Sequence, residues 1–343
     1  MTAWFDTQHC YFIAEIGVNH DGDVDVAKEM IDVAADAGAD AVKFQTFVAK
    51  RLVTPDAEKA AYQDTNDPRA GETQFQMLKR LELSREELIA CRDHCKVRGI
   101  EFLSTPFDEE SADLLEEVGV RGFKVSSGDL TNLPLLAHLA AKGLPIILST
   151  GMGSLEEVQD AVGTIQTAGS KEIAILHCVS NYPADPAECN LRAMDTMRDT
   201  FGVSIGWSDH TLGSEITLAA VARGARLIEK HFTLDTSRLG PDHKASLMPD
   251  ELVALIKGIR AVESALGDGV KQAQPSEIDT ARVARRSIIA AQDIPAGTEI
   301  TRGMLEMKRP GTGLKPKHLG QIVGHKAARN IAANTIISLE DVT

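Results

Sequence analysis

Short apolar runs alternate with longer stretches of helical periodicity over the first 265 residues of the chain. The runs have the length and the Val, Ile, Leu and Phe content of buried strands. There are eight of them, over residues 11–17, 41–46, 100–106, 122–128, 145–151, 173–180, 203–209 and 227–232. Apolar residues recur at helical spacing between them, and this spacing predicts helices over 24–37, 84–98, 109–118 and 154–168, and a last one from Pro249 to Gly267.

The alternation of apolar strands with helices predicts a parallel sheet that is buried on both faces. Eight such repeats in about 250 residues are typical of a closed (β/α)8 TIM barrel, which we place over residues 1–266. A doubly wound open sheet is the alternative. It normally carries a glycine-rich phosphate turn after its first strand, and the sequence EIGVNHDG at residues 15–22 is not that turn.

The C-terminal part of the chain has a different pattern of apolar and polar residues. Residues 267–284 are polar, contain Gly and Pro, and are predicted to be a linker. Residues 285–343 hold short β-like runs and are predicted to be a small domain. Its 59 residues are near the lower size limit for folding alone, so we expect it to be stabilised by packing against the barrel or against a partner chain.

The charge of the chain narrows the classes of function. Fifty Asp and Glu against 36 Lys and Arg give a net charge of −14, which argues against a protein that binds nucleic acid or a membrane surface. No apolar run approaches the ~20 residues of a membrane span, and the N-terminal sequence does not have the pattern of a signal peptide. The five cysteines are irregularly spaced, which is typical of reduced thiols, and we expect a cytoplasmic protein.

Polar or ionisable residues stand at the end of every predicted strand. In a TIM barrel the carboxyl ends of the strands form the active site. Two of these residues, Lys43 and Lys124, are cations within β-type runs. Point charges with neutral donors around them suit a small, multiply charged anion such as a phosphate or a carboxylate. The hydroxyl groups that accompany the lysines are those of Thr105, Ser127, Ser149 and Ser208.

His210 and His231 end consecutive predicted strands. Neighbouring strands lie ~4.8 Å apart, so both imidazoles could reach one metal ion. A site with two histidines that is completed by carboxylate or water suits Mn, Fe, Co or Zn. Glu15 and Asp242 are the candidates for the carboxylate or for holding the water.

Several motifs resemble those of the sialic acid synthase family. They are AEIGVNHDGD at 14–23, GADAVKFQTF at 38–47, FLSTPFD at 102–108, FKVSSGD at 123–129, ILSTGM at 147–152, HCVSNYP at 177–183, GWSDHT at 206–211, EKHFTLD at 229–235 and GPDHKASL at 240–247. The C-terminal part resembles the small antifreeze-like (SAF) domain of these enzymes, through AQDIPAGTEIT at 291–301 and KRPGTG at 308–313. The resemblance covers essentially the whole chain in one order.

This resemblance implies a role for each matched residue. The histidines His210 and His231 would bind a divalent metal, typically Mn²⁺. Glu15, Lys43 and Asp129 are the catalytic candidates, although many members have Glu where Asp129 stands and Asn where Ser180 stands. Phosphoenolpyruvate would be held by Lys43, Thr105, Lys124, Ser127, Ser149 and Ser208. The sugar side would be formed by Gln45, Ser180, Tyr182, Asp242 and, from the partner subunit of a domain-swapped homodimer, an arginine at the position of Arg309.

The resemblance also implies the reaction, which condenses phosphoenolpyruvate with an N-acylated mannosamine and releases phosphate. We expect N-acetylmannosamine and the product N-acetylneuraminate. The alternative is 2,4-diacetamido-2,4,6-trideoxymannose, which gives legionaminate; pseudaminate fits less well because GPDHKASL is intact. A barrel aldolase with Lys124 or Lys43 as a Schiff-base amine is a different class. A non-enzymatic carbohydrate- or ice-binding module over residues 285–343 would leave the polar strand ends unexplained.

Overall fold

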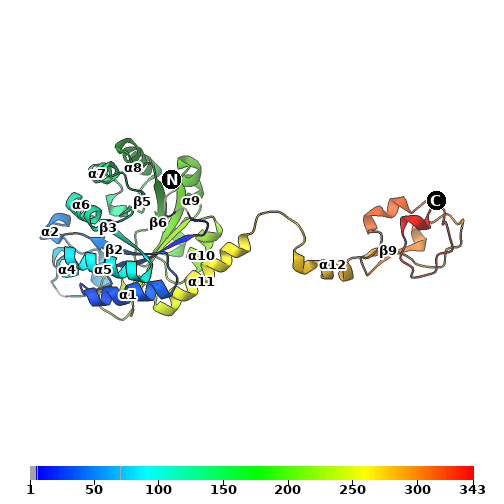
Figure 1. Cartoon of the computed structure of the whole chain (residues 1–343), viewed down its shortest axis with the longest axis horizontal. Coiled ribbons are helices and arrows are strands. Elements are labelled where there is room, and N and C mark those ends of the chain that lie inside the picture. Colours follow the sequence, from blue (N-terminus) through cyan, green and yellow to red (C-terminus); the bar gives the residue numbers. More distant parts are fainter. Residues whose placement is uncertain (1–4, 6, 70) are drawn as a thin grey trace. The chain divides into compact units, whose positions relative to one another are not determined.

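The computed structural model describes residue 5, residues 7–69 and residues 71–343. The chain divides into two compact units, Met1–Gly267 and Asp268–Thr343 (Figure 1). Among the described residues, no helix is both long enough and apolar enough to cross a lipid bilayer. The five cysteines are free thiols and all are buried.

The first unit is built on eight parallel strands in the order β3-β2-β1-β8-β7-β6-β5-β4, and the two end strands, β3 and β4, contact each other. Because β1 lies between β2 and β8, the sheet closes into a ring, which confirms the barrel and excludes the open sheet. The strands are β1 Tyr11–Gly17, β2 Ala41–Thr46, β3 Glu101–Pro106, β4 Phe123–Val125, β5 Ile146–Ser149, β6 Ile173–Cys178, β7 Ser204–Asp209 and β8 Leu227–His231.

Helices surround the outside of this ring (Figure 1). Their ends carry local signals: α5 begins after Ser84, whose hydroxyl accepts a hydrogen bond from the Glu87 amide, and it ends at Gly99 in the left-handed region (φ 70°). The helices of this unit are α1 Val24–Asp36, α2 Ala49–Leu52, α3 Ala61–Asn66, α4 Gln74–Leu81, α5 Arg85–Arg98, α6 Glu109–Val118, α7 Leu133–Ala141, α8 Leu155–Ala168, α9 Ala193–Phe201, α10 Glu215–Ala222 and α11 Pro249–Leu266.

The fourth strand is shorter than the sequence pattern predicts. It ends at Val125 because the Ser126 hydroxyl accepts a hydrogen bond from the Gly128 amide (3.2 Å) and starts a 3₁₀ turn over Ser127–Asp129. A side-chain acceptor of this kind competes with the strand ladder for the backbone donor. The turn directs residues 126–128 toward the mouth of the barrel, where Ser126, Ser127 and Gly128 line a cavity.

The interior of the barrel is apolar near the amino ends of the strands and polar near their carboxyl ends. Alternate side chains of a strand point inward, so β1 presents Ile13 and then Glu15, and β8 presents Leu227 and then Glu229. The apolar members form a small buried cluster that fills the amino-terminal half of the ring, with Tyr11, Ile13, Ala41, Leu103, Ile147, Ala174, Leu176 and Leu227. The polar members therefore collect at the carboxyl ends, above an apolar floor.

The connection between β2 and β3 is unusually long and holds α2, α3, α4 and α5. It has a hydrophobic cluster of its own, separate from the barrel core. We call this the β2–β3 cluster; its buried members are Val18, Phe47, Ala49, Met77, Leu78 and Leu81, and Leu52, Val53, Phe75 and Phe107 pack against them. The connection is thus a packed wall beside the mouth of the barrel.

The second unit has its own apolar core, which includes Ile288, Ile294 and Ile337. Its two strands, β9 Ser287–Ala290 and β10 Leu305–Lys308, are antiparallel. The helix α12 Ile278–Ala284 lies within the segment predicted as a linker. It belongs to the compact unit because the Gly311 amide donates to the Arg282 carbonyl (2.8 Å).

Candidate active site

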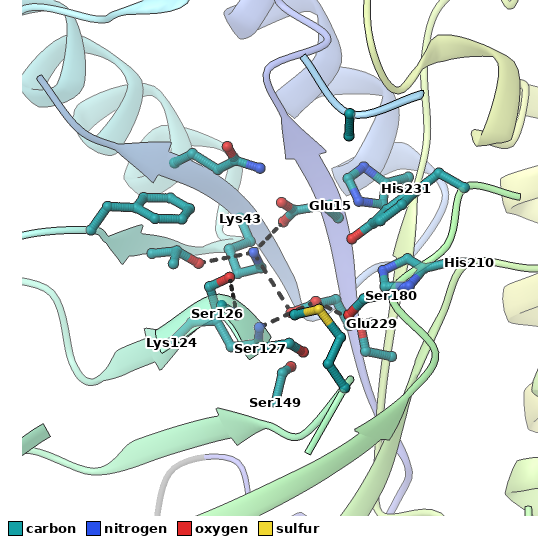
Figure 2. A pocket seen from close by; sticks show the side chains of 18 of the residues that line it. Glu15, Lys43, Lys124, Ser126, Ser127, Ser149, Ser180, His210, Glu229 and His231 are labelled. Carbon is teal, nitrogen blue, oxygen red and sulfur yellow. Dashed lines mark hydrogen bonds and ion pairs between the residues drawn. The ribbon is translucent and has the colours of Figure 1, made fainter. Parts of the chain in front are cut away.

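The carboxyl ends of the barrel strands surround a cavity of about 460 Å³ (Figure 2). Most of its lining residues are polar, and residues from every barrel strand or the loop that follows it contribute to it. Twelve of the residues predicted from the sequence line it, namely Glu15, Lys43, Gln45, Thr105, Lys124, Ser127, Ser149, Ser180, Tyr182, Ser208, His210 and His231. The structure thus brings together side chains that are up to 216 positions apart in the sequence.

Two lysines and two glutamates form a buried charged cluster at the floor of the cavity (Figure 2). The Lys43 ammonium lies 2.8 Å from Glu15 Oε2 and 3.8 Å from Glu229 Oε2. The Lys124 ammonium lies 3.4 Å from Glu229 Oε1. Each of these four side chains is at most 6% exposed, so the opposite charges compensate one another out of water.

The protonation of this cluster follows from burial and from the two cations. Burial would raise the pKa of Glu229, but Lys124 and Lys43 outweigh it and lower that pKa to about 2. Burial raises the pKa of Glu15 to about 7, against the opposing effect of Lys43. Burial also lowers the pKa of Lys124, whereas the two carboxylates overcome burial and raise the pKa of Lys43. Glu229 is thus a permanent anion, and Glu15 is poised to exchange a proton near neutrality.

Hydroxyl groups complete the anion-binding wall. Lys43 Nζ donates to Thr105 Oγ1 (3.1 Å), and Ser208 Oγ donates to Glu229 Oε1 (2.9 Å). Ser149 Oγ is buried and has no hydrogen-bond partner among the described residues. A buried hydroxyl without a partner costs free energy, which points to a ligand that would satisfy it.

Gly151 keeps space open between these hydroxyls. A Cβ atom at this position would lie 2.9 Å from Ser127 Oγ and closer still to Ser180 Oγ. The Gly151 amide donates to Ser127 Oγ (2.9 Å), so the backbone itself approaches the site. Glycine allows such an approach because it has no side chain.

The two histidines face the same cavity, with ring centroids 5.7 Å apart. His210 Nδ1 donates to the Val179 carbonyl (2.7 Å), which leaves Nε2 as the nitrogen with a lone pair. His231 Nδ1 is buried without a partner among the described residues. Burial lowers the pKa of His210 to about 4 and lowers the pKa of His231 still more clearly, so both rings are neutral at neutral pH.

Neutral imidazoles are the form that binds metals, so the pair fits a divalent cation. Within the described part of the chain, no group of three or more His, Cys, Asp and Glu side chains could hold a metal ion. An ion at the two histidines would therefore take its remaining ligands from water and substrate, as a catalytic metal with open positions does.

Aromatic and polar groups form the side of the cavity opposite the lysines. The Tyr182 ring lies 4.1 Å from the His210 ring and 5.0 Å from the stacked Tyr62 ring, between centroids. A second cavity of about 270 Å³ shares part of this wall and is lined by Asp242. Burial raises the pKa of Asp242 to about 6.

Two predicted residues, Asp129 and Arg309, line neither of these two cavities. Asp129 is not among their lining residues, because its carboxylate accepts a hydrogen bond from the Asn132 side chain (3.0 Å) in the turn before α7. The geometry therefore favours Glu15 over Asp129 as the acid or base. Arg309 is an exposed residue of the second unit, and its predicted role at a partner's site stays a prediction.

Some lining residues were not assigned a role from the sequence. Glu229 stands two positions before His231, so strand alternation could have placed both on the inward face of β8. Ser126 precedes the turn that shortens β4. Tyr62 and Gln74 come from the β2–β3 connection, and no local pattern connects them to the barrel mouth.

Residues 30–271 match the NeuB family, and residues 285–343 match the SAF domain. The N,N′-diacetyllegionaminic acid synthase of Legionella pneumophila is 45% identical over 97% of this chain and 94% of its own length. The protein of the same name from Campylobacter jejuni is 46% identical over 95% of this chain and 98% of its own.

Among solved structures, the N-acetylneuraminic acid (sialic acid) synthetase of Leptospira borgpetersenii, in complex with citrate, is similar to this chain. The identity is 36% and the TM-score is 0.70, with 80% of this chain and 90% of that chain covered. The family match spans most of the barrel, and the relatives match nearly their whole length. The chain therefore belongs to the NeuB family, the sialic acid synthase family whose motifs its strand ends carry.

Proposed function

We propose that this enzyme condenses phosphoenolpyruvate with an N-acylated mannosamine, and that the sugar is 2,4-diacetamido-2,4,6-trideoxymannose. The observation that carries the proposal is the buried cluster of Lys43 and Lys124, with hydroxyls around it, beside two neutral histidines. It offers two cations to a phosphate and a carboxylate, and it offers a metal site to an aldehyde.

The comparisons favour this sugar over N-acetylmannosamine, which the sequence motifs first suggested. The relatives named as N,N′-diacetyllegionaminic acid synthases are 45% and 46% identical, whereas the structure named as an N-acetylneuraminic acid synthetase is 36% identical. All of them match over at least 80% of this chain, so the difference in identity does not come from a shorter match.

Lys43 and Lys124 would hold the charged ends of phosphoenolpyruvate, and Ser149 would donate its free hydroxyl to one of them. C3 of the enol attacks the sugar aldehyde, so a C–C bond forms and the aldehyde oxygen becomes a hydroxyl. Positive charge develops at C2, where a water molecule adds. The C2–O bond to phosphate then breaks, inorganic phosphate leaves with the electron pair of that bond, and the C2 hydroxyl loses its proton as C2 becomes a ketone. Of the two protons of the added water, one ends on the former aldehyde oxygen and the other on the phosphate.

Glu15 would accept the proton of the water that adds at C2. Its pKa of about 7 leaves a substantial fraction ionised at neutral pH, and the adjacent Lys43 ammonium stabilises that form. The lysines also hold the enol over the aldehyde, and such positioning can supply much of the rate enhancement.

His210 and His231 would hold the divalent metal, for which we propose Mn²⁺. When bound, the ion would supply Lewis-acid polarisation of the aldehyde oxygen. The fit rests on two observations: both rings are neutral at neutral pH, and His210 directs its protonated nitrogen at a carbonyl, which leaves the other nitrogen for the cation.

A Schiff-base aldolase is disfavoured by the charged cluster. Schiff-base formation needs a neutral amine. The carboxylates Glu15 and Glu229 raise the pKa of Lys43 and hold it as an ammonium. Burial lowers the pKa of Lys124, but the Glu229 carboxylate 3.4 Å away opposes this effect and favours the charged form. Borohydride reduction in the presence of pyruvate should therefore leave no covalent adduct on either lysine.

The proposed reaction is tested by phosphate release from phosphoenolpyruvate against a panel of N-acyl hexoses, with and without a chelator. We expect release that depends on both the sugar and the metal, fastest with 2,4-diacetamido-2,4,6-trideoxymannose. Absence of release with every sugar, in a preparation loaded with Mn²⁺, would exclude the function.

We also propose that the active site is shared within a domain-swapped homodimer. Residues 268–343 carry eleven Lys and Arg against eight Asp and Glu, whereas the whole chain carries 36 against 50. The second unit is therefore basic and the barrel is strongly acidic, and such charges attract across chains. Arg309, on an exposed loop of the basic unit, would reach the sugar's N-acyl group in the partner's barrel.

Complementation distinguishes an arginine that acts in the partner's site from one that acts in its own. The variants Arg309→Ala and His210→Ala, each inactive, are unfolded and refolded together. If Arg309 acts in the partner's site, each mixed dimer has one intact site, and random pairing leaves about a quarter of all sites intact. No recovery, with mixed dimers shown by mass, would refute the shared site.

A further inference from the structure

The second cavity, of about 270 Å³, adjoins the active-site cavity. The two share a wall, so a molecule at the metal site can extend from one into the other; this wall is formed by Gln45, Tyr62, Gln74, Phe107, Ser126, Tyr182 and His231. Beyond this wall most of the lining residues are apolar, and Gln63 and Asp242 are the polar ones among the described residues. The far end is formed by Leu52, Val53, Met77, Leu78 and Leu81, all of them members of the β2–β3 cluster.

The chemistry of this far end is unusual for a site that would receive a sugar. Sugars carry hydroxyl groups, and burying a hydroxyl without a hydrogen-bond partner costs free energy. Among the described residues that line the second cavity, none is a lysine or an arginine, so a phosphate group would have no cation there. The lining suits methyl groups instead.

The orientation of the substrate follows from the first cavity. The lysines lie on one side of the site and would hold phosphoenolpyruvate, and the histidines mark the place of the aldehyde. The aldehyde carbon is C1 of the sugar, so the distal carbons C4 to C6 must lie away from the lysines. His231 lines both cavities, which places the second cavity directly beyond the aldehyde position.

We infer that the second cavity is the recognition site for an apolar distal end of the sugar, namely a C6 methyl group and the methyl of an acyl group on C4. This inference rests on the proposed function and adds to it the residues that select the sugar. The polar groups at the entrance, Gln45 and Asp242, remain available to the C4 nitrogen and the C5 hydroxyl. A C6 hydroxyl would enter an apolar end, and a C6 phosphate would be excluded.

The inference is tested with sugars that differ at one position. N-acetylmannosamine and its 6-deoxy analogue differ by the C6 hydroxyl, and 2,4-diacetamido-2,4,6-trideoxymannose adds the C4 acyl group. Burial of one methyl group changes kcat/KM by about fourfold. We expect kcat/KM to rise at least fourfold at each step of this series, and N-acetylmannosamine 6-phosphate to give no turnover.

Variants of residues that line the second cavity test whether this cavity causes the preference for the 6-deoxy sugar. Val53→Thr and Leu52→Gln add a polar group to half-buried side chains at the far end and should reduce the preference for the 6-deoxy sugar to less than twofold. Val48→Thr is the matched control, because Val48 is also half-buried in the same connection but does not line the cavity. Thermal melts of all three variants check that the fold is retained.

Binding is measured separately from turnover, so that failure of the reaction does not hide the result. The open-chain alditols of N-acetylmannosamine and of its 6-deoxy analogue are titrated by calorimetry in the presence of Mn²⁺. Tighter binding of the 6-deoxy alditol, lost in Val53→Thr, supports the subsite even if phosphate release fails. Equal binding of the two alditols, or equal effects of Val53→Thr and Val48→Thr, would overturn it even if phosphate release is observed.

Discussion

Asp209 and Lys230 form an ion pair that is buried between β7 and β8, on the face opposite the cavity. Lys230 Nζ lies 2.7 Å from Asp209 Oδ2, and the two side chains are 1% and 0% exposed. Asp209 also accepts from the Thr211 amide (2.9 Å), the Thr211 hydroxyl (2.8 Å) and the Thr217 hydroxyl. The pair thus joins the two strand ends that carry His210 and His231.

The substitution Lys230→Met should lower the free energy of unfolding by about 3 kcal/mol. Breaking a buried pair leaves a charge without its partner and costs about 3–5 kcal/mol. The lower end applies because three donors to the Asp209 carboxylate remain. The measurement is urea denaturation followed by circular dichroism and by the fluorescence of Trp207, which is buried in β7.

The loss of stability caused by Lys230→Met should depend on pH and should be smaller at acidic pH. Burial alone would raise the pKa of Asp209, but Lys230 and the hydrogen bonds lower it, so in the native protein this stabilisation is present above the unfolded pKa and is lost on acidification. Without Lys230 the burial effect dominates, the folded pKa rises above the unfolded value, and protonation then relieves the defect. The difference in stability between the native protein and Lys230→Met should therefore be smaller at pH 4 than at pH 7.

Two comparisons can refute this reasoning. Lys79→Met removes an ion pair of similar length, 2.6 Å to Glu82, at a lysine that is 61% exposed, and it should cost less than about 1 kcal/mol. The double variant Asp209→Asn/Lys230→Met removes both charges, so it should cost at least about 2 kcal/mol less than the sum of the single variants. If Lys230→Met lowers the free energy of unfolding no more than Lys79→Met does, the pair is not buried as described. The same conclusion follows if the losses in the two single variants of the pair simply add in the double variant.

Four further predictions concern the active site. Chelation should abolish turnover and Mn²⁺ should restore it, and His210→Ala or His231→Ala should lower the bound metal in elemental analysis while circular dichroism shows that the fold is retained. Lys124→Ala should raise KM for phosphoenolpyruvate by roughly one to two decades, with KM for the sugar unchanged, because a charge-assisted contact is worth about 1.5–3 kcal/mol. Because Glu15 has a pKa of about 7 and acts as a base, kcat/KM should rise with pH through about 7, and Glu15→Gln should lose this limb of the pH profile. Gly151→Ala should lower kcat/KM at least tenfold, roughly the effect of one lost hydrogen-bond contact, because the added methyl would collide with serine hydroxyls of the anion site; an unchanged kcat/KM would contradict the crowding.

The sequence by itself determined the barrel and most of the side chains at its mouth. Strand alternation has a fixed period of two, so the inward position of Glu15 follows from the apolar run that contains it. Helix ends are equally local, as Ser84 and Gly99 show for α5.

Only the tertiary structure decided which charged side chains form ion pairs with one another. Glu229 pairs with Lys43 and Lys124, and neither contact follows from spacing along the chain, because each pair joins strands that are not neighbours in the ring. Asp129 turns away from the cavity because a hydrogen bond within its own turn is available to it. The apolar second cavity depends on the packing of the β2–β3 connection against the barrel mouth. Such contacts depend on ring closure and on side-chain packing across long sequence separations, which no local periodicity encodes.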